Sequence, residues 1–287
     1  MRENLKELWR FRELLITLIE RDLRIRYKNS YLGFFWSLLN PILMMGVMTL
    51  VLRIVMDNKM PSVTVYILAA YLPFMFFQMA LMDSAQSVVG ALPIIRKVYF
   101  PREVLPLAAI ASNFIHFLLA LSLFFIYILV VWIRHPQIPP FSWTMLLLPA
   151  LLFVNMCFAC GVGLIVSALN TFYEDVKYLV GFALYLGYFL CPVMYFSENV
   201  YYSNNLIERG IRDQVYFAYH LNPLAMFCTA YRKILVAPSP VSVNNQFVPA
   251  LDLDWGLLSI TAIFSILLLI YGYHLFNKLK WKFVERP

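Results

Sequence analysis

Long apolar runs separated by short polar segments make up most of this chain. A run of about 20 apolar residues is long enough to cross the hydrocarbon layer of a bilayer as a helix. The pattern predicts transmembrane helices at residues 31–55, 63–89, 105–133, 143–169, 177–196 and 255–276. The expected fold class is therefore an all-α integral membrane protein, whose six-span transmembrane domain occupies residues 31–287.

Two segments outside these spans have patterns of their own. Residues 3–22 have an apolar face and a charged face at helical spacing, which is typical of an amphipathic helix in the membrane interface. With the basic run that follows it, this helix forms a separate unit over residues 1–30. The loop at residues 197–254 contains an apolar stretch too short to span a membrane, which favours re-entrant or interfacial helices on the outer side.

The composition excludes a soluble globular fold, because 62% of the residues are hydrophobic and only 14% are charged. The net charge of +7 could suggest nucleic acid, but the bases lie beside the apolar runs, so no nucleic-acid partner is expected. The side that holds the termini carries 16 of the 23 Lys and Arg residues. By the positive-inside rule, both termini are predicted to be cytoplasmic.

The chain shows no catalytic or metal-binding motif. It lacks a G-x-x-x-x-G-K-[ST] phosphate loop, so ATP, if it drives the protein, binds another chain. Cys157 and Cys160 lie in an apolar run, where a small apolar helix residue is expected rather than a metal ligand. Asp252 and Asp254 form a D-x-D pair, but Asp254 directly precedes the last span and is expected to cap it. Asp83 lies inside an apolar run, where it either belongs to a functional site or makes a structural hydrogen bond, and both roles stay open.

The segment at residues 94–106, between the second and third predicted spans, is basic and contains prolines. Pro101 and Pro106 turn the chain, because each lacks an N–H and restricts the residue before it. A short helix packed there across the membrane surface would present Arg96, Arg102 and Glu103 to solvent or to a partner. A basic loop that obeys the positive-inside rule is the alternative.

Aromatic residues recur in the fifth predicted span at spacings of four, three and four, which places them on one helix face. They are Tyr178, Phe182, Tyr185 and Phe189. Such a face can contact a ligand that slides along it without binding any one part of that ligand tightly. Packing against neighbouring helices is the alternative, because aromatic side chains at helical spacing often form protein cores.

Distinct motifs lie before and within the first predicted span and after the second and fourth. Another lies in the outer loop. They are Glu20-Arg21-Asp22-Leu23-Arg24-Ile25-Arg26-Tyr27 with Leu32-Gly33-Phe34-Phe35-Trp36 and Asn40-Pro41, Ile95-Arg96-Lys97-Val98-Tyr99-Phe100-Pro101-Arg102-Glu103-Val104-Leu105-Pro106, Asn170-Thr171-Phe172-Tyr173-Glu174-Asp175, and Asn222-Pro223-Leu224. In this combination the chain resembles the permease subunits of polysaccharide-exporting type-2 ABC transporters, the group that handles O-antigen, capsule and teichoic acid.

The resemblance implies a homodimer of permeases in the bacterial cytoplasmic (inner) membrane, with two copies of a cytoplasmic ABC ATPase that binds ATP and Mg. The cargo would be a lipid-linked polysaccharide, and no cofactor is expected on this chain. A coupling helix would lie near residues 90–103, and the ATPase-coupling residues would be Arg96, Lys97, Phe100, Arg102, Glu103, Glu174 and Asp175. The first and fifth spans would line the conduit, with a substrate pathway of Phe34, Phe35, Trp36, Tyr178, Phe182, Tyr185 and Phe189.

Two other functions are open at this point. A membrane-embedded glycosyltransferase that uses a polyprenyl-linked sugar would need paired carboxylates free of neighbouring bases, and the predicted cytoplasmic loops hold no such cluster. A permease of the same fold that exports a drug or a small lipid would have the same architecture. A gene for an ABC ATPase beside this one, among genes for sugar polymers, would distinguish the three.

Overall fold

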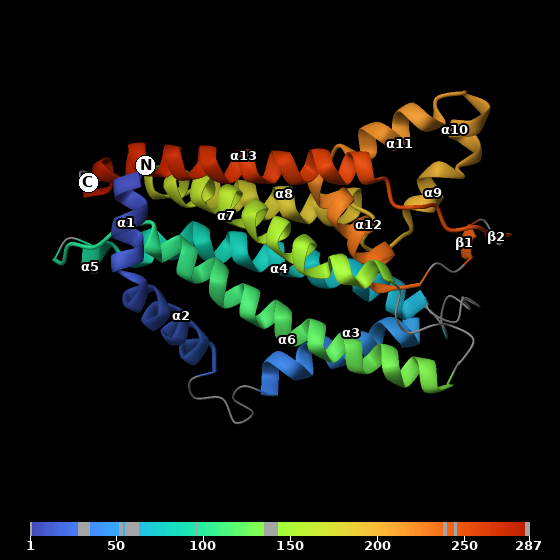
Figure 1. Cartoon of the computed structure of the whole chain (residues 1–287), viewed down its shortest axis with the longest axis horizontal. Coiled ribbons are helices and arrows are strands. Elements are labelled where there is room, and N and C mark those ends of the chain that lie inside the picture. The colour runs from blue at the N-terminus through green and yellow to red at the C-terminus, as the bar shows by residue number, and fades with distance from the viewer. Residues whose placement is uncertain are drawn as a thin grey trace.

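The computed structural model of this chain is built mostly from helices (Figure 1). It describes residues 2–27, 35–51, 54, 63–95, 97–134, 143–237, 240–243 and 246–284. The long helices run side by side along the molecule, and α1 (Arg2–Arg10) lies at the same end as η3 (Lys280–Val284). The short helices α9 (Ser197–Tyr201), α10 (Asn204–Glu208) and α11 (Arg212–His220) lie at the opposite end.

Within the described residues, four helical stretches are long and apolar enough to cross a membrane. They are Val63–Gly90 (α4), Val104–Ile133 in α6 (Val104–Arg134), Trp143–Phe172 in η2 (Trp143–Leu147) and α7 (Leu148–Phe172), and Trp255–Phe283 in α13 (Trp255–Leu279) and η3. These stretches match four of the six predicted spans.

The other two predicted spans correspond to less complete helices. Helix α8 (Val176–Leu190) is apolar, but its 15 residues are shorter than the usual length of a membrane span. The predicted first span includes α3 (Phe35–Leu50) and continues beyond the described residues. The number of six spans therefore stays a prediction.

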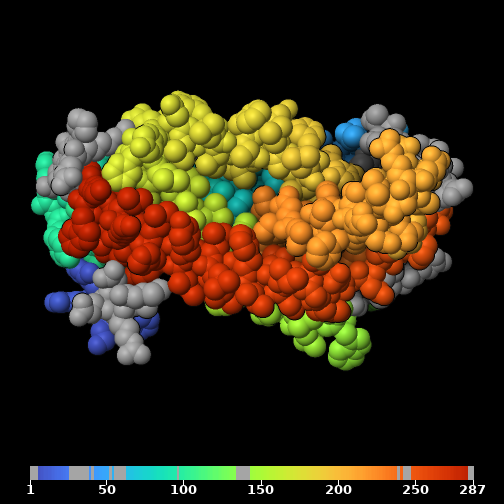
Figure 2. Space-filling view, turned by 90° about the horizontal axis from the view of Figure 1, so that it is seen from above, coloured from blue at the N-terminus to red at the C-terminus, as the bar shows by residue number. Residues whose placement is uncertain are grey.

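Helices α7 and α13 approach each other closely at two glycines. A Cβ on Gly161 would lie 2.8 Å from the backbone carbon of Leu268 and from the backbone nitrogen of Leu269. A Cβ on Gly272 would in turn collide with the carbonyl oxygen of Gly161. Small residues allow helix backbones in a membrane to pack this closely. Figure 2 shows α13, in red, running along one face of the molecule beside the yellow α7 and α8.

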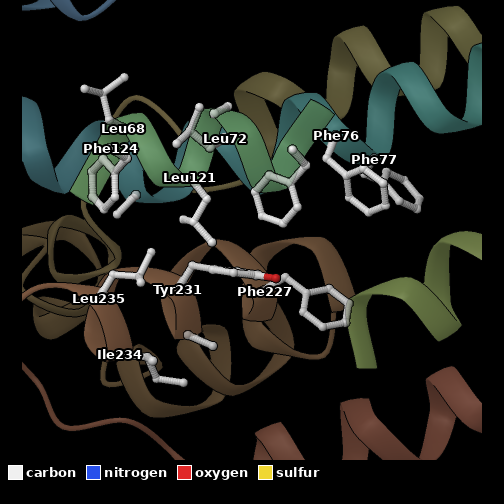
Figure 3. Packing of buried hydrophobic residues seen from close by; sticks show 14 of the residues in the cluster. Leu68, Leu72, Phe76, Phe77, Leu121, Phe124, Phe227, Tyr231, Ile234 and Leu235 are labelled. Carbon is white, nitrogen blue, oxygen red and sulfur yellow. The ribbon is translucent and has the colours of Figure 1, made fainter. Parts of the chain in front are cut away.

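Helix α4 forms the centre of the bundle. Its most apolar window is 72% buried inside the protein, whereas the corresponding windows of α6 and α13 are 22% buried. It packs against α6, α7 and α12 (Pro223–Leu235). Figure 3 shows Leu72 and Phe76 of α4 facing Tyr231 and Phe227 of α12 across the core.

The N-terminal segment forms two helices where the sequence predicts one. Helix α1 is followed by α2 (Arg12–Tyr27), and the two are separated at Phe11. The apolar side chains of Leu8, Leu15 and Leu18 pack against the end of the bundle, and α2 lies against α6. On the predicted polar face, the charged side chains that the structure describes are exposed.

The predicted outer loop at residues 197–254 is folded into α9 to α12 and a short β-hairpin. The hairpin consists of β1 (Val241–Val243) and β2 (Gln246–Val248), which pair antiparallel with Val241 opposite Val248. Helix α12 is the most deeply buried of these elements, since most of its side chains pack against α4 and its neighbours. The hairpin is strand structure that the hydrophobic pattern does not predict.

Side chains cap the N-termini of α12 and α13. Asn222 Oδ1 accepts a hydrogen bond from the backbone N–H of Leu224 at 3.1 Å, which starts α12. Asp254 Oδ1 accepts one from the backbone N–H of Leu257 at 3.0 Å, which starts α13. The capping role predicted for Asp254 is confirmed.

Candidate functional site

The turn between α4 and α6 contains the segment predicted to couple this chain to an ATPase. Within residues 90–103, the described part of the chain contains one short helix, α5 (Leu92–Ile95), followed by an irregular stretch. The exposed side chains of this stretch are Lys97, Val98 and Tyr99. Phe100 is half-buried and packs against the apolar cluster at this end of the bundle. Arg96 lies outside the described residues.

Glu103 is fully buried at the N-terminal end of α6. Both of its carboxylate oxygens lie 3.3 Å from Lys280 Nζ, and the Tyr273 hydroxyl donates a hydrogen bond to Oε1 at 3.5 Å. The half-buried Arg102 donates to the backbone carbonyl of Lys280, and its guanidinium lies 6.0 Å from the centre of the Phe283 ring. The expectation that Glu103 faces solvent or a partner is wrong, because a lysine from the end of the chain neutralises its charge inside the protein.

A second contact joins the coupling segment to the N-terminal helices. The Tyr99 hydroxyl donates a hydrogen bond to Glu7 Oε1 at 2.9 Å. This bond and the negative charge of Glu7 raise the pKa of Tyr99. A cavity of about 330 Å³ lies between α2 and the coupling segment, lined mainly by apolar side chains that include Phe11, Leu18 and Phe100. The N-terminal helices therefore rest directly on the segment predicted to move with the ATPase.

The turn between α7 and α8 contains Glu174 and Asp175, the other predicted coupling residues, and both are exposed. Next to them, Asn170 is buried and joins two helices. Its Nδ2 donates to the carbonyl of Ala85 in α4 at 2.8 Å, and its Oδ1 accepts from the backbone N–H of Lys177 at 3.0 Å. Asn170 thus satisfies one amide at the start of α8 and fixes the turn to α4. The motif around Asn170 is visible in the sequence, but the elements that it joins are not.

The aromatic face of α8 is exposed along the helix. The exposed fractions are 68% for Tyr178, 61% for Phe182, 61% for Tyr185 and 59% for Phe189. The rings of Tyr185 and Phe189 contact each other edge to face, with centroids 5.3 Å apart. Within one chain these four rings are therefore not packed into the core, which removes intramolecular packing as their explanation.

Two other sets of predicted residues have different outcomes. Phe34 lies outside the described residues, and so do the side chains of Phe35 and Trp36 at the start of α3. Asp83 Oδ2 accepts a hydrogen bond from Nδ2 of the buried Asn113 at 2.8 Å. Asp83 also lines a cavity of about 500 Å³ between α2, α4 and α6. The structural hydrogen bond that the sequence left open for Asp83 is present.

The end of the molecule that holds α9 to α11 contains a buried polar cluster that the sequence does not indicate. The guanidinium of Arg232 donates to the backbone carbonyls of Tyr66 at 2.8 Å, Tyr195 at 2.6 Å and Val193 at 2.7 Å. Beside it, Lys233 Nζ lies 3.2 Å from Glu198 Oε1. Burial alone would raise the pKa of Glu198, but Lys233 and the hydrogen bonds to its carboxylate hold the pKa below its ordinary value.

His220 belongs to the same end and links α11 to α12. Its Nδ1 lies 3.0 Å from the carbonyl oxygen of Tyr216, and its Nε2 lies 3.1 Å from Thr229 Oγ1. Because a carbonyl only accepts, Nδ1 carries the proton and Nε2 accepts from the threonine hydroxyl. Burial lowers the pKa of His220, so the neutral imidazole is the form that fits. These contacts hold α11 against α12.

A family model described as ABC-2 type transporter matches residues 13–236. The chain belongs to the ABC-2 type transporter family. The matched region of this ABC-2 chain contains α2 from its second residue, the coupling segment, the turn between α7 and α8, and helices α8 to α12. Helix α13 and η3 lie beyond it.

Curated relatives of the ABC-2 chain carry the names of transport proteins. The O-antigen export system permease protein RfbA of Klebsiella pneumoniae is 27% identical over 273 residues, which cover 95% of this chain and 94% of that protein. RfbA of Myxococcus xanthus is 30% identical over 229 residues, with coverage of 80% and 82%. The polysialic acid transport protein KpsM of Escherichia coli is 24% identical over 181 residues, with coverage of 62% and 68%. The ABC-2 chain is therefore a transporter membrane subunit rather than an enzyme.

Proposed function

We propose that this chain is the permease subunit of an ATP-driven exporter that moves a lipid-linked polysaccharide across the bacterial cytoplasmic membrane. The observation that carries this proposal is the similarity over almost the whole chain to permeases named for O-antigen export. The relative named for polysialic acid transport extends the same substrate class to capsule. Neither the glycosyltransferase nor the drug or small-lipid exporter has an observation in its favour.

The working unit in this proposal is a homodimer with six spans per chain, cytoplasmic termini and re-entrant outer helices. Two copies of a cytoplasmic ABC ATPase bind it and supply the ATP and Mg. The end of the molecule that holds η3 and α5 receives the ATPase, through Lys97 and Phe100 of the coupling segment and through Glu174 and Asp175. The exposed side chains of Lys97, Glu174 and Asp175 support that assignment, and Phe100 is half-buried beside them.

The substrate pathway in this proposal runs along the aromatic face of α8. Exposure of four aromatic rings in a row to water is unfavourable. In the assembled protein, lipid, a second chain or the polymer must therefore cover them. The hydroxyl of Tyr185 favours the polymer, because an O–H in the hydrocarbon layer lacks a hydrogen-bonding partner that a wet conduit supplies. The aromatic residues at the start of the first span would face α8 across the conduit.

The test measures polymer at the cell surface in a strain that lacks the native gene and carries plasmid-borne variants. Tyr185→Ala and Phe182→Ala should lower surface polymer at least several-fold, while the amount of membrane-inserted protein and of dimer stays normal. Leu179→Ala is the matched control, because Leu179 lies on the same helix, is 67% exposed and has no ring. It should leave export unchanged.

Two results would decide against parts of this proposal. Normal export by both ring variants, or an equal loss with the leucine variant, would remove the aromatic face from the pathway. Normal surface polymer in the strain without the gene would remove the export function itself.

A further inference from the structure

The C-terminal turn η3 contacts both of the segments that the proposed function assigns to the ATPase. The Phe283 ring is fully buried, with the Arg102 guanidinium 6.0 Å from its centre on one side. On another side it packs against Phe172, the last residue of α7, with ring centroids 5.6 Å apart. Arg102 belongs to the coupling segment, and Phe172 directly precedes the turn with Glu174 and Asp175. One aromatic side chain therefore lies between the two turns.

Lys280 strengthens this junction by ionic contacts. Its ammonium lies 3.3 Å from both oxygens of the buried Glu103, and its backbone carbonyl accepts a hydrogen bond from Arg102. The side chains of Glu103 and Lys280 are 0% and 8% exposed. Removal of one partner from such a pair leaves a buried charge without compensation, so replacement of Lys280 alone should disrupt the junction. Phe283 and Phe276 pack with centroids 5.4 Å apart, which anchors the junction on α13.

We propose that η3 is a coupling element, in which Lys280 and Phe283 act as positioning residues that hold the coupling segment and the α7–α8 turn together as one body on α13. An ATP-driven displacement of either turn then moves both turns and α13. This inference rests on the proposed function, because it needs an ATPase that pushes on these turns. It adds an element that lies outside the residues matched by the family model.

The structure supplies a matched control for the ionic pair at the other end of the molecule. Glu198 and Lys233 form a second Glu–Lys pair, with an N–O distance of 3.2 Å and side chains that are 5% and 12% exposed. Its chemistry and burial resemble those of Glu103 and Lys280, but it lies among the outer helices. A purely structural role would make the two pairs equivalent in every measurement.

The experiment uses the complete complex, co-expressed with its ABC ATPase, and measures polymer exported per ATP hydrolysed. Lys280→Met and Phe283→Leu should each lower this ratio about ten-fold or more, with ATP hydrolysis retained. Lys233→Met should lower the yield or the melting temperature of the complex while the ratio per folded complex stays within about two-fold of wild type. Lys280→Arg, which keeps the charge, should recover most of the ratio.

Several outcomes would overturn the inference. An unchanged ratio in folded Lys280→Met complexes would do so, and so would an equal loss of coupling in Lys233→Met. If Lys280→Met does not accumulate, Phe283→Leu decides, because it keeps an apolar side chain of similar size at the junction. A wild-type complex that hydrolyses ATP without exporting polymer would refute the proposed function, whereas a coupled wild type with equally coupled variants would refute only the role of η3.

Discussion

Gly161→Ala tests the packing of α7 against α13 most sharply. The added Cβ would lie 2.8 Å from two backbone atoms of α13, in Leu268 and Leu269, and 2.9 Å from the carbonyl oxygen of Leu268. Ordinary contacts between such atoms begin near 3.5 Å, so the two helices must separate by roughly 1 Å or bend. Backbone atoms cannot rotate away as a flexible side chain can. Overpacking of this kind costs about 1–3 kcal/mol, and we expect a loss of stability in that range.

The assay is the melting temperature of the detergent-solubilised protein, followed by size-exclusion chromatography after heating. At roughly 2–4 °C for each kcal/mol in a protein of this size, the variant should melt about 2–12 °C below wild type. Gly46→Ala in α3 is the matched control, because a Cβ there would have no atom within 4 Å, and its melting temperature should be unchanged or slightly higher. A Gly161→Ala protein as stable as wild type would show that α7 and α13 are not in this contact.

Two further predictions concern topology and pH. A cysteine at Asn204 should react with a membrane-impermeant maleimide on intact cells, and one at Glu174 only after lysis. Both positions are exposed, and the four native cysteines are buried. The reverse labelling pattern would show that the predicted orientation in the membrane is wrong. Because burial lowers the pKa of His220, the unfolded chain binds protons first as the pH falls. Stability should therefore fall below pH about 6.5, by up to about 1.4 kcal/mol per pH unit until His220 itself protonates in the fold. His220→Gln should flatten the dependence of melting temperature on pH between 7.5 and 5.5, and an unaltered slope would show that another group is responsible.

The long helices could be predicted from the sequence because a membrane span is a property of one continuous segment. The predicted span at 63–89 agrees with α4 at Val63–Gly90, and the span at 105–133 agrees with α6 at Val104–Arg134. The cap at Asp254 is equally local, since the aspartate and the amide that it binds are three residues apart. Length, hydropathy and capping chemistry are sufficient for features of this kind.

The environment of the candidate site could not be predicted, because it depends on residues far apart in the chain. Glu103 reads as an exposed acid in a basic loop, and only the fold brings Lys280 to it across 177 positions. Asn170 reads as one member of a motif, and its hydrogen bond to Ala85 spans 85 positions. The break between α1 and α2 at Phe11 has no glycine or proline beside it from which it could be predicted. For Glu103 and Asn170, a tertiary contact rather than a local preference decides the environment of the side chain.

The export function is tested most directly by ATP-dependent translocation of polymer into inverted membrane vesicles. The vesicles contain lipid-linked polysaccharide on their outer, cytoplasmic surface, and an added glycosidase digests whatever has not entered the lumen. ATP should raise the protected fraction of polymer only when this chain and its ABC ATPase are both present. Protection that rises equally in vesicles without this chain, or that does not rise with ATP when both proteins are present, would contradict the export function.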